Sequence, residues 1–105
     1  IVGEVKTHIT IDEIQRIVCE HLSIPPDLLR AKTRKQEIVT ARQIAMYLSK
    51  ELTNSSLKTI GLHFGGRDHS TVIHAYQTVE ATMKEDQKMK SMVQQLKSKL
   101  EIGQR

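Results

Sequence analysis

The chain has 105 residues, 38% of them apolar, so it has room for one small hydrophobic core and one domain. Its single cysteine, Cys19, cannot form an internal disulfide, which excludes a disulfide-stabilised secreted scaffold and favours a reducing, cytoplasmic compartment. No apolar run approaches the roughly 18 residues that a membrane-spanning helix needs, and no export signal is seen. Because the chain begins at Ile1 rather than Met, we expect one module of a longer protein, with residues 1–8 the end of a linker and 9–105 the domain.

The net charge of +4 is unevenly distributed along the chain. Residues 1–29 carry two basic and five acidic side chains, residues 30–50 carry six and one, and residues 51–105 carry eight and six. The middle segment therefore has a net charge of +5, which the acidic N-terminal segment masks in the total. A concentrated positive charge of this kind suits an anionic partner.

The first predicted helix begins at a strong N-terminal signal. Thr10 and Glu13 have the spacing of a capping box, and Ile9 and Ile14 have the spacing of a hydrophobic staple. Cys19 is expected to pack beside the apolar side of the helix as a small apolar residue. The apolar residues of this side recur at helical spacing: Ile11, Ile14, Ile17, Val18 and Leu22.

Pro25 and Pro26 end this helix and favour a short helical turn at residues 27–29. Residues 30–39 have no apolar face, and we predict a flexible basic arm there. A second capping-box pattern starts at Thr40, so the next helix is predicted from Thr40 to about Thr53. Its buried side comprises Ile44, Ala45, Leu48 and Leu52.

Three further helices follow in the C-terminal half. Ser55 or Ser56 caps a short helix that ends at Phe64, and residues 65–66, both glycine, can take the positive φ of a helix C-terminus. Asp68 is placed as the N-cap of the next helix. The buried sides of the last two helices comprise Val72, Tyr76, Val79 and Met83, and then Met89, Val93, Leu96 and Leu100. No segment alternates like a strand, so we predict an all-α domain of about six helices.

The helix ending at Phe64, the glycine turn and the helix after Asp68 form a helix-turn-helix pattern. In this motif the second helix enters the major groove of DNA with its first turn facing the base edges, and that turn offers His69, Ser70 and Thr71. Asp68 can cap the helix with one carboxylate oxygen and accept from a cytosine amino group with the other. The alternative is that these residues are only a capped helix start, which is common in soluble proteins.

The basic arm supplies candidates for contacts outside the major groove. Arg34 is our first choice for insertion into the minor groove, where a deepened negative potential favours guanidinium groups. Arg42 and Gln43 at the start of the following helix, Lys50 further along it, and Arg67 in the turn are expected to contact phosphates and fix the register. A charge run is also often only a solvated loop, and this alternative stays open.

The remaining polar residues do not form a recognisable metal or catalytic site. His69 and His74 are five residues apart, whereas helical zinc pairs are usually four apart. Neither a glycine-rich phosphate loop, nor a nucleophile elbow, nor an acid pair is present. We therefore expect no cofactor, no metal and no enzymatic activity in this domain.

Three stretches together point to a family: residues 65–75 (GGRDHSTVIHA), residues 41–48 (ARQIAMYL) and residues 50–53 (KELT). They closely resemble the C-terminal DNA-binding domain, domain IV, of the DnaA family of bacterial replication initiators, over about residues 9–100. The resemblance implies a Trp-repressor-like fold with a helix-turn-helix motif and a basic loop. The eleven-residue stretch is far more specific than a bare helix-turn-helix, because it fixes the turn, the cap and the reading residues together.

The resemblance implies binding to DnaA boxes, short asymmetric duplex sites similar to TTATCCACA, at the replication origin, for the initiation and regulation of replication. In that family an arginine of the basic loop enters the minor groove, and Arg34 matches it. The residues that would read the major groove are Asp68, His69, Ser70 and Thr71, with Leu57 and Lys58 beside them. The residues that would contact phosphates are Arg42, Gln43, Lys50, Thr53, Asn54 and Ala75. Ser70 stands where Thr is common, which loses a methyl contact, and Lys58 stands where Pro is common, which adds a charge.

The resemblance also implies an AAA+ ATPase module with bound ATP, an oligomerisation region and contact with acidic phospholipids, all for a parent protein, since no motif here encodes them. The domain itself is expected to be monomeric and nucleoid-associated, with regulatory proteins docking on the reading helix. Two alternatives stay open. One is a transcriptional regulator that binds promoter DNA and dimerises through the last helix, and the other is a lipid-surface or protein-docking module that uses the lysines of that helix.

Overall fold

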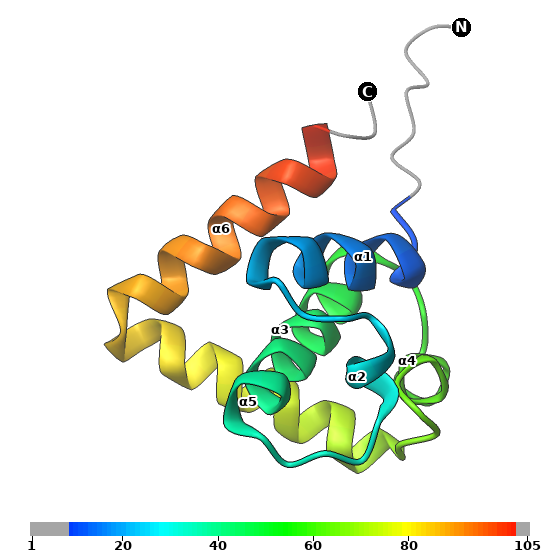
Figure 1. Cartoon of the computed structure of the whole chain (residues 1–105). Coiled ribbons are helices and arrows are strands. Elements are labelled where there is room, and N and C mark those ends of the chain that lie inside the picture. The colour runs from blue at the N-terminus through cyan, green and yellow to red at the C-terminus, as the bar shows by residue number, and fades with distance from the viewer. Residues whose placement is uncertain (1–8, 103–105) are drawn as a thin grey trace, which may run out of the picture.

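The computed structural model describes residues 9–102. Within this range the chain forms helices only: α1 (Ile11–Leu22), α2 (Asp27–Arg30), α3 (Gln36–Leu52), α4 (Leu57–His63), α5 (His69–Glu85) and α6 (Gln87–Ile102) (Figure 1). The predicted all-α class with six helices is therefore confirmed for this part of the chain. The segment 1–8, predicted as the end of a linker, lies outside the described residues. No helix of the described part is long and apolar enough to cross a membrane.

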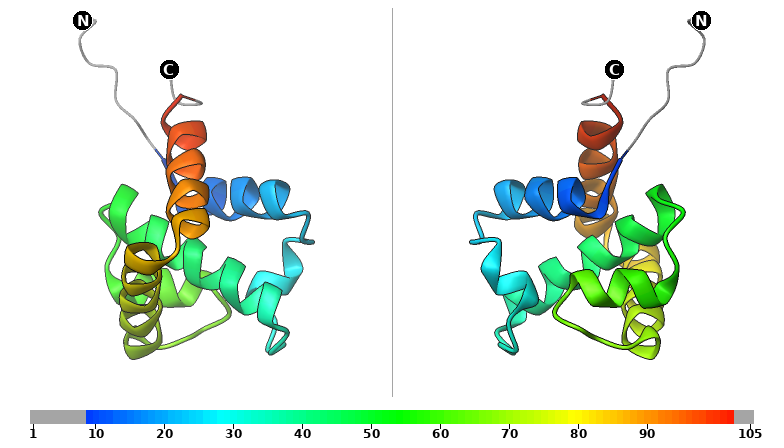
Figure 2. Two further views of the ribbon diagram at one scale, coloured as in Figure 1. Left: turned by 90° about the vertical axis from the view of Figure 1, so that its left-hand side faces the viewer. Right: turned by 90° about the vertical axis from the view of Figure 1, so that its right-hand side faces the viewer.

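Helix α3 lies at the centre and packs against α1, α2, α4 and α5, while α6 packs on α5 and crosses α1 (Figure 2). The apolar sides predicted from the helical spacing face this centre, and burial of that surface drives the packing. Phe64, just after α4, is the largest fully buried side chain and lies beside the turn that leads to α5. Other large apolar side chains with no exposed surface include Ile14, Leu29, Ile44, Leu48, Ile60, Val72 and Leu96.

Side-chain caps determine where four of the helices begin. The predicted capping box of α1 is present: Glu13 N donates to Thr10 Oγ1 over 3.1 Å, and Thr10 N donates to Glu13 Oε1 over 3.2 Å. Ser56 caps α4 and Asp68 caps α5, as predicted. Asp86, which was not predicted as a cap, accepts from backbone N–H groups in the first turn of α6. Each cap satisfies donors that the first turn leaves unpaired.

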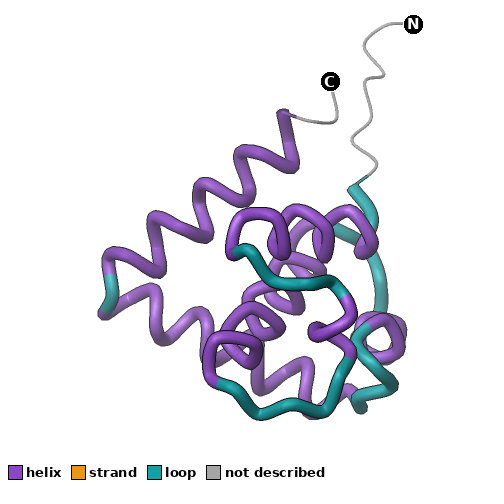
Figure 3. Tube along the Cα trace, in the orientation of Figure 1, coloured by secondary structure: helices purple, strands orange, loops and turns teal. Residues whose placement is uncertain are grey.

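The prediction that α3 begins at Thr40 is wrong, because the helix begins at Gln36 after an N-cap residue, Lys35, whose side chain makes no capping bond. The physical reason is Ile38, which is only 3% exposed and anchors the additional first turn in the core. Thr40 lies inside the helix, where its Oγ1 accepts from Gln36 Nε2 over 3.1 Å. The basic arm is therefore shorter than predicted and comprises residues 31–35, the loop along the lower edge of Figure 3.

Candidate nucleic-acid interface

The turn between α4 and α5 needs glycine for two different reasons. Gly65 and Gly66 have φ values of +83° and +78°, in the left-handed region that other residues rarely adopt. Gly61, in α4, is needed for close approach: a Cβ there would lie 1.9 Å from the carbonyl oxygen of Arg67. The Arg67 N–H also donates to the carbonyl of Gly61 over 3.0 Å. The turn is therefore packed directly on α4, which fixes the start of α5.

The first turn of α5 presents the predicted reading residues at the surface. Asp68, His69, Ser70 and Thr71 are all exposed. Thr71 donates twice to Asp68 Oδ1, from its backbone N–H over 3.0 Å and from its hydroxyl over 3.1 Å. The backbone bond, followed by the hydroxyl bond, lowers the pKa of Asp68. Asp68 is therefore an ionised acceptor near neutral pH, while the hydroxyl proton of Thr71 is committed to the cap.

Arg42 connects the basic arm to α3. Its Nε donates to the carbonyl of Leu29 over 3.0 Å, and its Nη2 donates to the carbonyl of Ala31 over 3.0 Å, with a longer contact of 3.4 Å to the carbonyl of Thr33. The residue is only 7% exposed. In the structure this guanidinium holds the backbone of α2 and of the arm, whereas from the sequence we expected it to contact a phosphate from the first turn of a helix starting at Thr40.

Arg67 connects the same arm to the helix-turn-helix. Its Nη2 donates to the carbonyl of Ala31 over 2.9 Å, and its Nη1 donates to the carbonyl of Phe64. The backbones also meet, because a Cβ at Gly65 would lie 2.4 Å from the carbonyl oxygen of Arg30. The arm and the N-terminal end of α5 therefore share one end of the molecule, the lower end in Figure 1. Arg34 is exposed on this arm.

The two arginines concentrate positive charge beneath the arm. Burial, and then the neighbouring charge of Arg67, lowers the pKa of Arg42, and burial also lowers the pKa of Arg67. Guanidinium groups nevertheless stay charged in proteins. Within residues 9–102 neither makes an ion pair with a carboxylate. Their charge therefore adds to the positive potential at this end of the molecule.

The sequence and the geometry lead to one family, because the family model described as bacterial dnaA protein helix-turn-helix matches residues 11–79, more than half of the chain. The chain belongs to this family. It is 50% identical over 94 residues to the chromosomal replication initiator protein DnaA of Chlorobaculum tepidum, covering 90% of this chain and 19% of that protein. It is 42% identical over 92 residues to the protein of the same name from Bacteroides thetaiotaomicron, covering 88% and 20%. The chain thus spans about a fifth of the length of these curated relatives.

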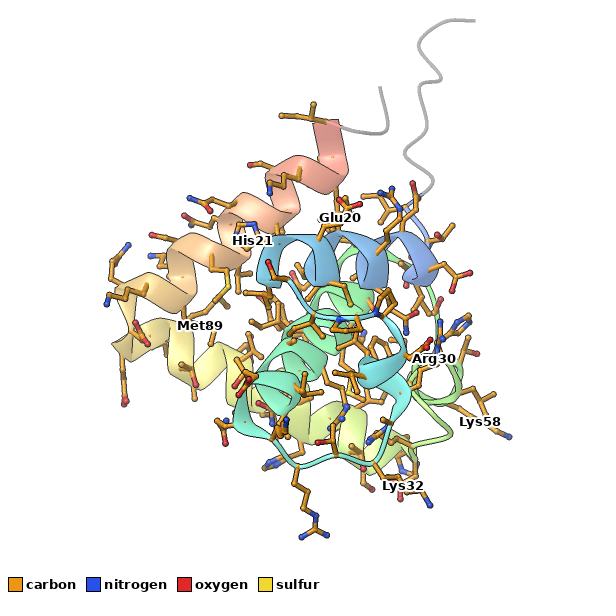
Figure 4. All side chains as sticks on the ribbon, in the orientation of Figure 1. Glu20, His21, Arg30, Lys32, Lys58 and Met89 are labelled. Atoms are coloured by element: carbon orange, nitrogen blue, oxygen red, sulfur yellow. The ribbon has the colours of Figure 1, made fainter. Side chains whose placement is uncertain are left out.

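The other predicted contact residues of this DnaA-family domain differ in their exposure to solvent. Lys50, Asn54 and Lys58 are exposed, and Figure 4 shows Lys58 on the same side of the view as Arg30 and Lys32. Leu57 and Gln43 are half-buried, and Leu57 packs against the core.

Thr53 and Ala75 lie in positions that limit contact with a phosphate. The Thr53 hydroxyl donates to the carbonyl of Ser49 over 2.6 Å and accepts from Ser55 N over 3.2 Å. Ala75 is 2% exposed on the buried side of α5, between Val72 and Val79. The structure therefore does not bring Ala75 to the surface formed by the arm and the first turn of α5.

A buried glutamine behind this surface links three helices through hydrogen bonds that were not predicted from the sequence. Gln15 is 4% exposed. Its Nε2 donates to the carbonyl of His63 over 2.8 Å, and its Oε1 accepts from Arg30 Nη2 over 3.3 Å. Gln15 thus links α1 to the ends of α2 and α4. The burial of Gln15 could have been predicted from its spacing, since it lies one helical turn from both Ile11 and Val18 on the apolar side of α1.

Two features of the described residues bear on metal binding and on nucleophilic chemistry. They contain no group of three or more His, Cys, Asp or Glu side chains that could hold a metal ion. Cys19 is buried, and desolvation raises its pKa against the lowering influence of Arg30. Because the thiolate is the reactive form, this thiol is packed as a core residue and is poorly suited to nucleophilic chemistry.

Proposed function

We propose that this domain binds double-stranded DNA sequence-specifically at DnaA boxes of a bacterial replication origin. The first turn of α5 reads the major groove, and the arm of residues 31–35 enters the adjacent minor groove. The observation that carries the proposal is that Arg67, in the helix-turn-helix, donates to the carbonyl of Ala31, in the arm, over 2.9 Å. The two elements are thereby held at one end of the molecule, as binding to neighbouring grooves of one duplex requires.

The residues of this surface then have separate roles. Asp68, His69, Ser70 and Thr71 contact base edges beside Leu57 and Lys58, and Arg34 lies in the minor groove. Contacts to phosphates come from the exposed Lys50 and Asn54 and from the half-buried Gln43 and Thr53.

The proposal extends to the longer protein of which the curated relatives are examples. We propose that residues 1–8 are the end of a linker, and that an ATPase module with bound ATP lies elsewhere in the parent protein. We further propose that the parent acts in the cytoplasm at the nucleoid, contacts acidic phospholipids, and initiates and regulates replication. Regulatory proteins would dock on the exposed face of α5, and ATP hydrolysis would need no residue of this domain.

The test is a titration of the 105-residue chain with a DnaA-box duplex and with a scrambled duplex of the same composition. His69→Ala is expected to cost about 1–3 kcal/mol on the box and little on the scrambled duplex, because it removes only a base contact. Lys50→Ala is expected to weaken both complexes and to reduce the salt slope by about 1, because it removes a phosphate contact.

Lys90→Ala is the matched control for Lys50→Ala, because Lys90 is an equally exposed lysine on α6, away from the arm. It should leave both affinities unchanged. Equal affinity of the unsubstituted chain for the two duplexes would refute sequence-specific binding. A transcriptional role at promoters uses the same box preference, so this titration alone does not exclude that alternative.

A further inference from the structure

We propose that Arg42 and Arg67 are positioning residues that preset the basic arm for Arg34, through the carbonyl oxygen of Ala31 that they share. We call this arrangement the Ala31 clamp. The inference rests on the proposed function and changes the roles of these two arginines, both predicted from the sequence to bind phosphates. In the clamp they act on DNA through the position of Arg34.

The clamp is made by donors from two separate rigid elements. Arg42 Nη2, from α3, and Arg67 Nη2, from the turn before α5, lie 3.0 and 2.9 Å from the same carbonyl oxygen. A second bond from each side chain fixes its plane: Arg42 Nε donates to Leu29, and Arg67 Nη1 donates to Phe64. A carbonyl oxygen has two lone pairs, so Ala31 can accept both bonds.

The burial of these side chains supports positioning over direct contact with DNA. Arg42 is 7% exposed, and Arg67 is half-buried with both terminal nitrogens engaged. A planar guanidinium can hold two carbonyls at once, which a lysine cannot do in the same geometry. The residue type is therefore matched to a bidentate backbone clamp.

The consequence for binding is preorganisation. An arm that is free in solution must lose backbone freedom when Arg34 enters a groove, and this entropy loss weakens binding. The clamp fixes Ala31, three residues before Arg34, relative to the first turn of α5. The distance between the two reading elements is thus set before DNA arrives.

The variant that tests the clamp is Arg67→Lys, which keeps the charge but loses the double donation. Trypsin is the first readout, because the arm carries three cleavage sites at Lys32, Arg34 and Lys35. We expect cleavage in the arm to become at least about fivefold faster in the absence of DNA, since the opening of a segment governs its proteolysis. Arg16→Lys is the control, because it makes the same chemical change at an exposed site on α1.

The second readout is a double-mutant cycle with Arg34→Ala on the box duplex. Arg67→Lys is expected to weaken binding about tenfold in the unsubstituted chain and less than about twofold when Arg34 is already Ala. A direct phosphate contact predicts equal losses in both backgrounds, and that result would overturn the clamp. Unchanged trypsin cleavage would overturn it as well.

Two further measurements keep the outcomes distinct. Thermal melting shows whether a variant is folded at the temperature of the assays. If Arg67→Lys does not fold, both readouts are measured on Arg42→Lys, which changes the donor from α3. If the unsubstituted chain binds box and scrambled duplexes equally, the proposed function fails, while the trypsin readout still decides whether the clamp holds the arm.

Discussion

The replacement Gly61→Ala tests the tightest backbone contact of the helix-turn-helix. The added Cβ would lie 1.9 Å from the carbonyl oxygen of Arg67 and 3.0 Å from its carbonyl carbon. An unstrained contact between carbon and oxygen needs about 3.3 Å, so these backbone atoms must separate by roughly 1.4 Å. The hydrogen bond from Arg67 N to the Gly61 carbonyl, 3.0 Å long, lies at the same point and is disturbed with them.

The magnitude follows from opposing effects on the free energy of unfolding. Gly61 lies in α4, where helix propensity alone would make alanine more stable by about 1 kcal/mol. Overpacking typically costs about 1–3 kcal/mol, and weakening the Arg67–Gly61 bond adds about 1 kcal/mol. Because the added Cβ clashes with backbone atoms of Arg67, which cannot move aside like a flexible side chain, the overpacking cost falls in the upper part of that range, at about 2–3 kcal/mol. The gain in helix propensity and the loss of the hydrogen bond cancel, so we expect a net loss of about 2–3 kcal/mol, which in a domain of this size lowers Tm by roughly 10–20 °C.

The assay is thermal and urea unfolding of the 105-residue chain, followed by the far-ultraviolet circular dichroism of its helices. Gly66→Ala is the matched control, because its φ of +78° disfavours alanine but no atom lies within 4 Å of the added Cβ. That variant should lose only about 1 kcal/mol. A Tm of Gly61→Ala equal to that of the unsubstituted chain would show that the contact is not tight. A free energy of unfolding no lower than that of Gly66→Ala would show the same.

Two further predictions concern the pH dependence of stability. The hydrogen bond to Glu51, followed by desolvation, raises the pKa of Tyr76, so the folded state keeps this proton when the unfolded chain has lost it. This stabilisation is present below the pKa of an unfolded tyrosine, near 10, and is lost as pH rises further. Tyr76→Phe should therefore flatten the decline of the urea-unfolding free energy at alkaline pH. An unchanged decline would contradict the assignment to Tyr76. The pKa of Asp68 is lowered by its bonds from Thr71, so its stabilisation is present above the ordinary carboxylate pKa near 4 and is lost as pH falls. Asparagine is also a good N-cap, so Asp68→Asn should fold normally at neutral pH and lose less stability in acid. If its free energy of unfolding falls with decreasing pH as steeply as that of the unsubstituted chain, Asp68 is not the source of the acid dependence.

The elements that the sequence predicted correctly are those determined by close neighbours in the chain. Thr10 with Glu13 and Asp68 with Thr71 are three residues apart, so the caps that they form are visible as spacing. The start of α3 was predicted wrongly because two local signals disagree there. The capping-box pattern favours a start at Thr40, whereas Ile38, which is 3% exposed, continues the buried side of Ala41, Ala45 and Leu48 at helical spacing by one more turn.

The same distinction applies to the candidate site. The exposure of Asp68, His69 and Arg34 follows from a helix start and a loop without apolar residues, and it was predicted correctly. The burial of Arg42 was not predictable, because the carbonyls that it binds come from α2 and from the arm that follows it, 13 and 11 residues earlier in the chain. Ala75 could have been placed in the core, since it falls on the apolar side between Val72 and Val79.

The packing of α6 bears on how many copies of the domain a binding site must accommodate. Its apolar side is used within the domain, where Val93, Leu96 and Leu100 are 2%, 0% and 3% exposed. Of the large apolar side chains of α6, Met89 and Met92 are half-buried, and Ile102 in the last turn is exposed at 62%. A dimer interface on α6 would therefore have to form mainly from polar side chains, and lysine and serine are depleted from interface cores. In the complex that we propose, the arm and the first turn of α5 are two different reading elements, joined through the Ala31 carbonyl. A domain of that kind suits a single asymmetric site, whereas a palindromic site requires a symmetric pair.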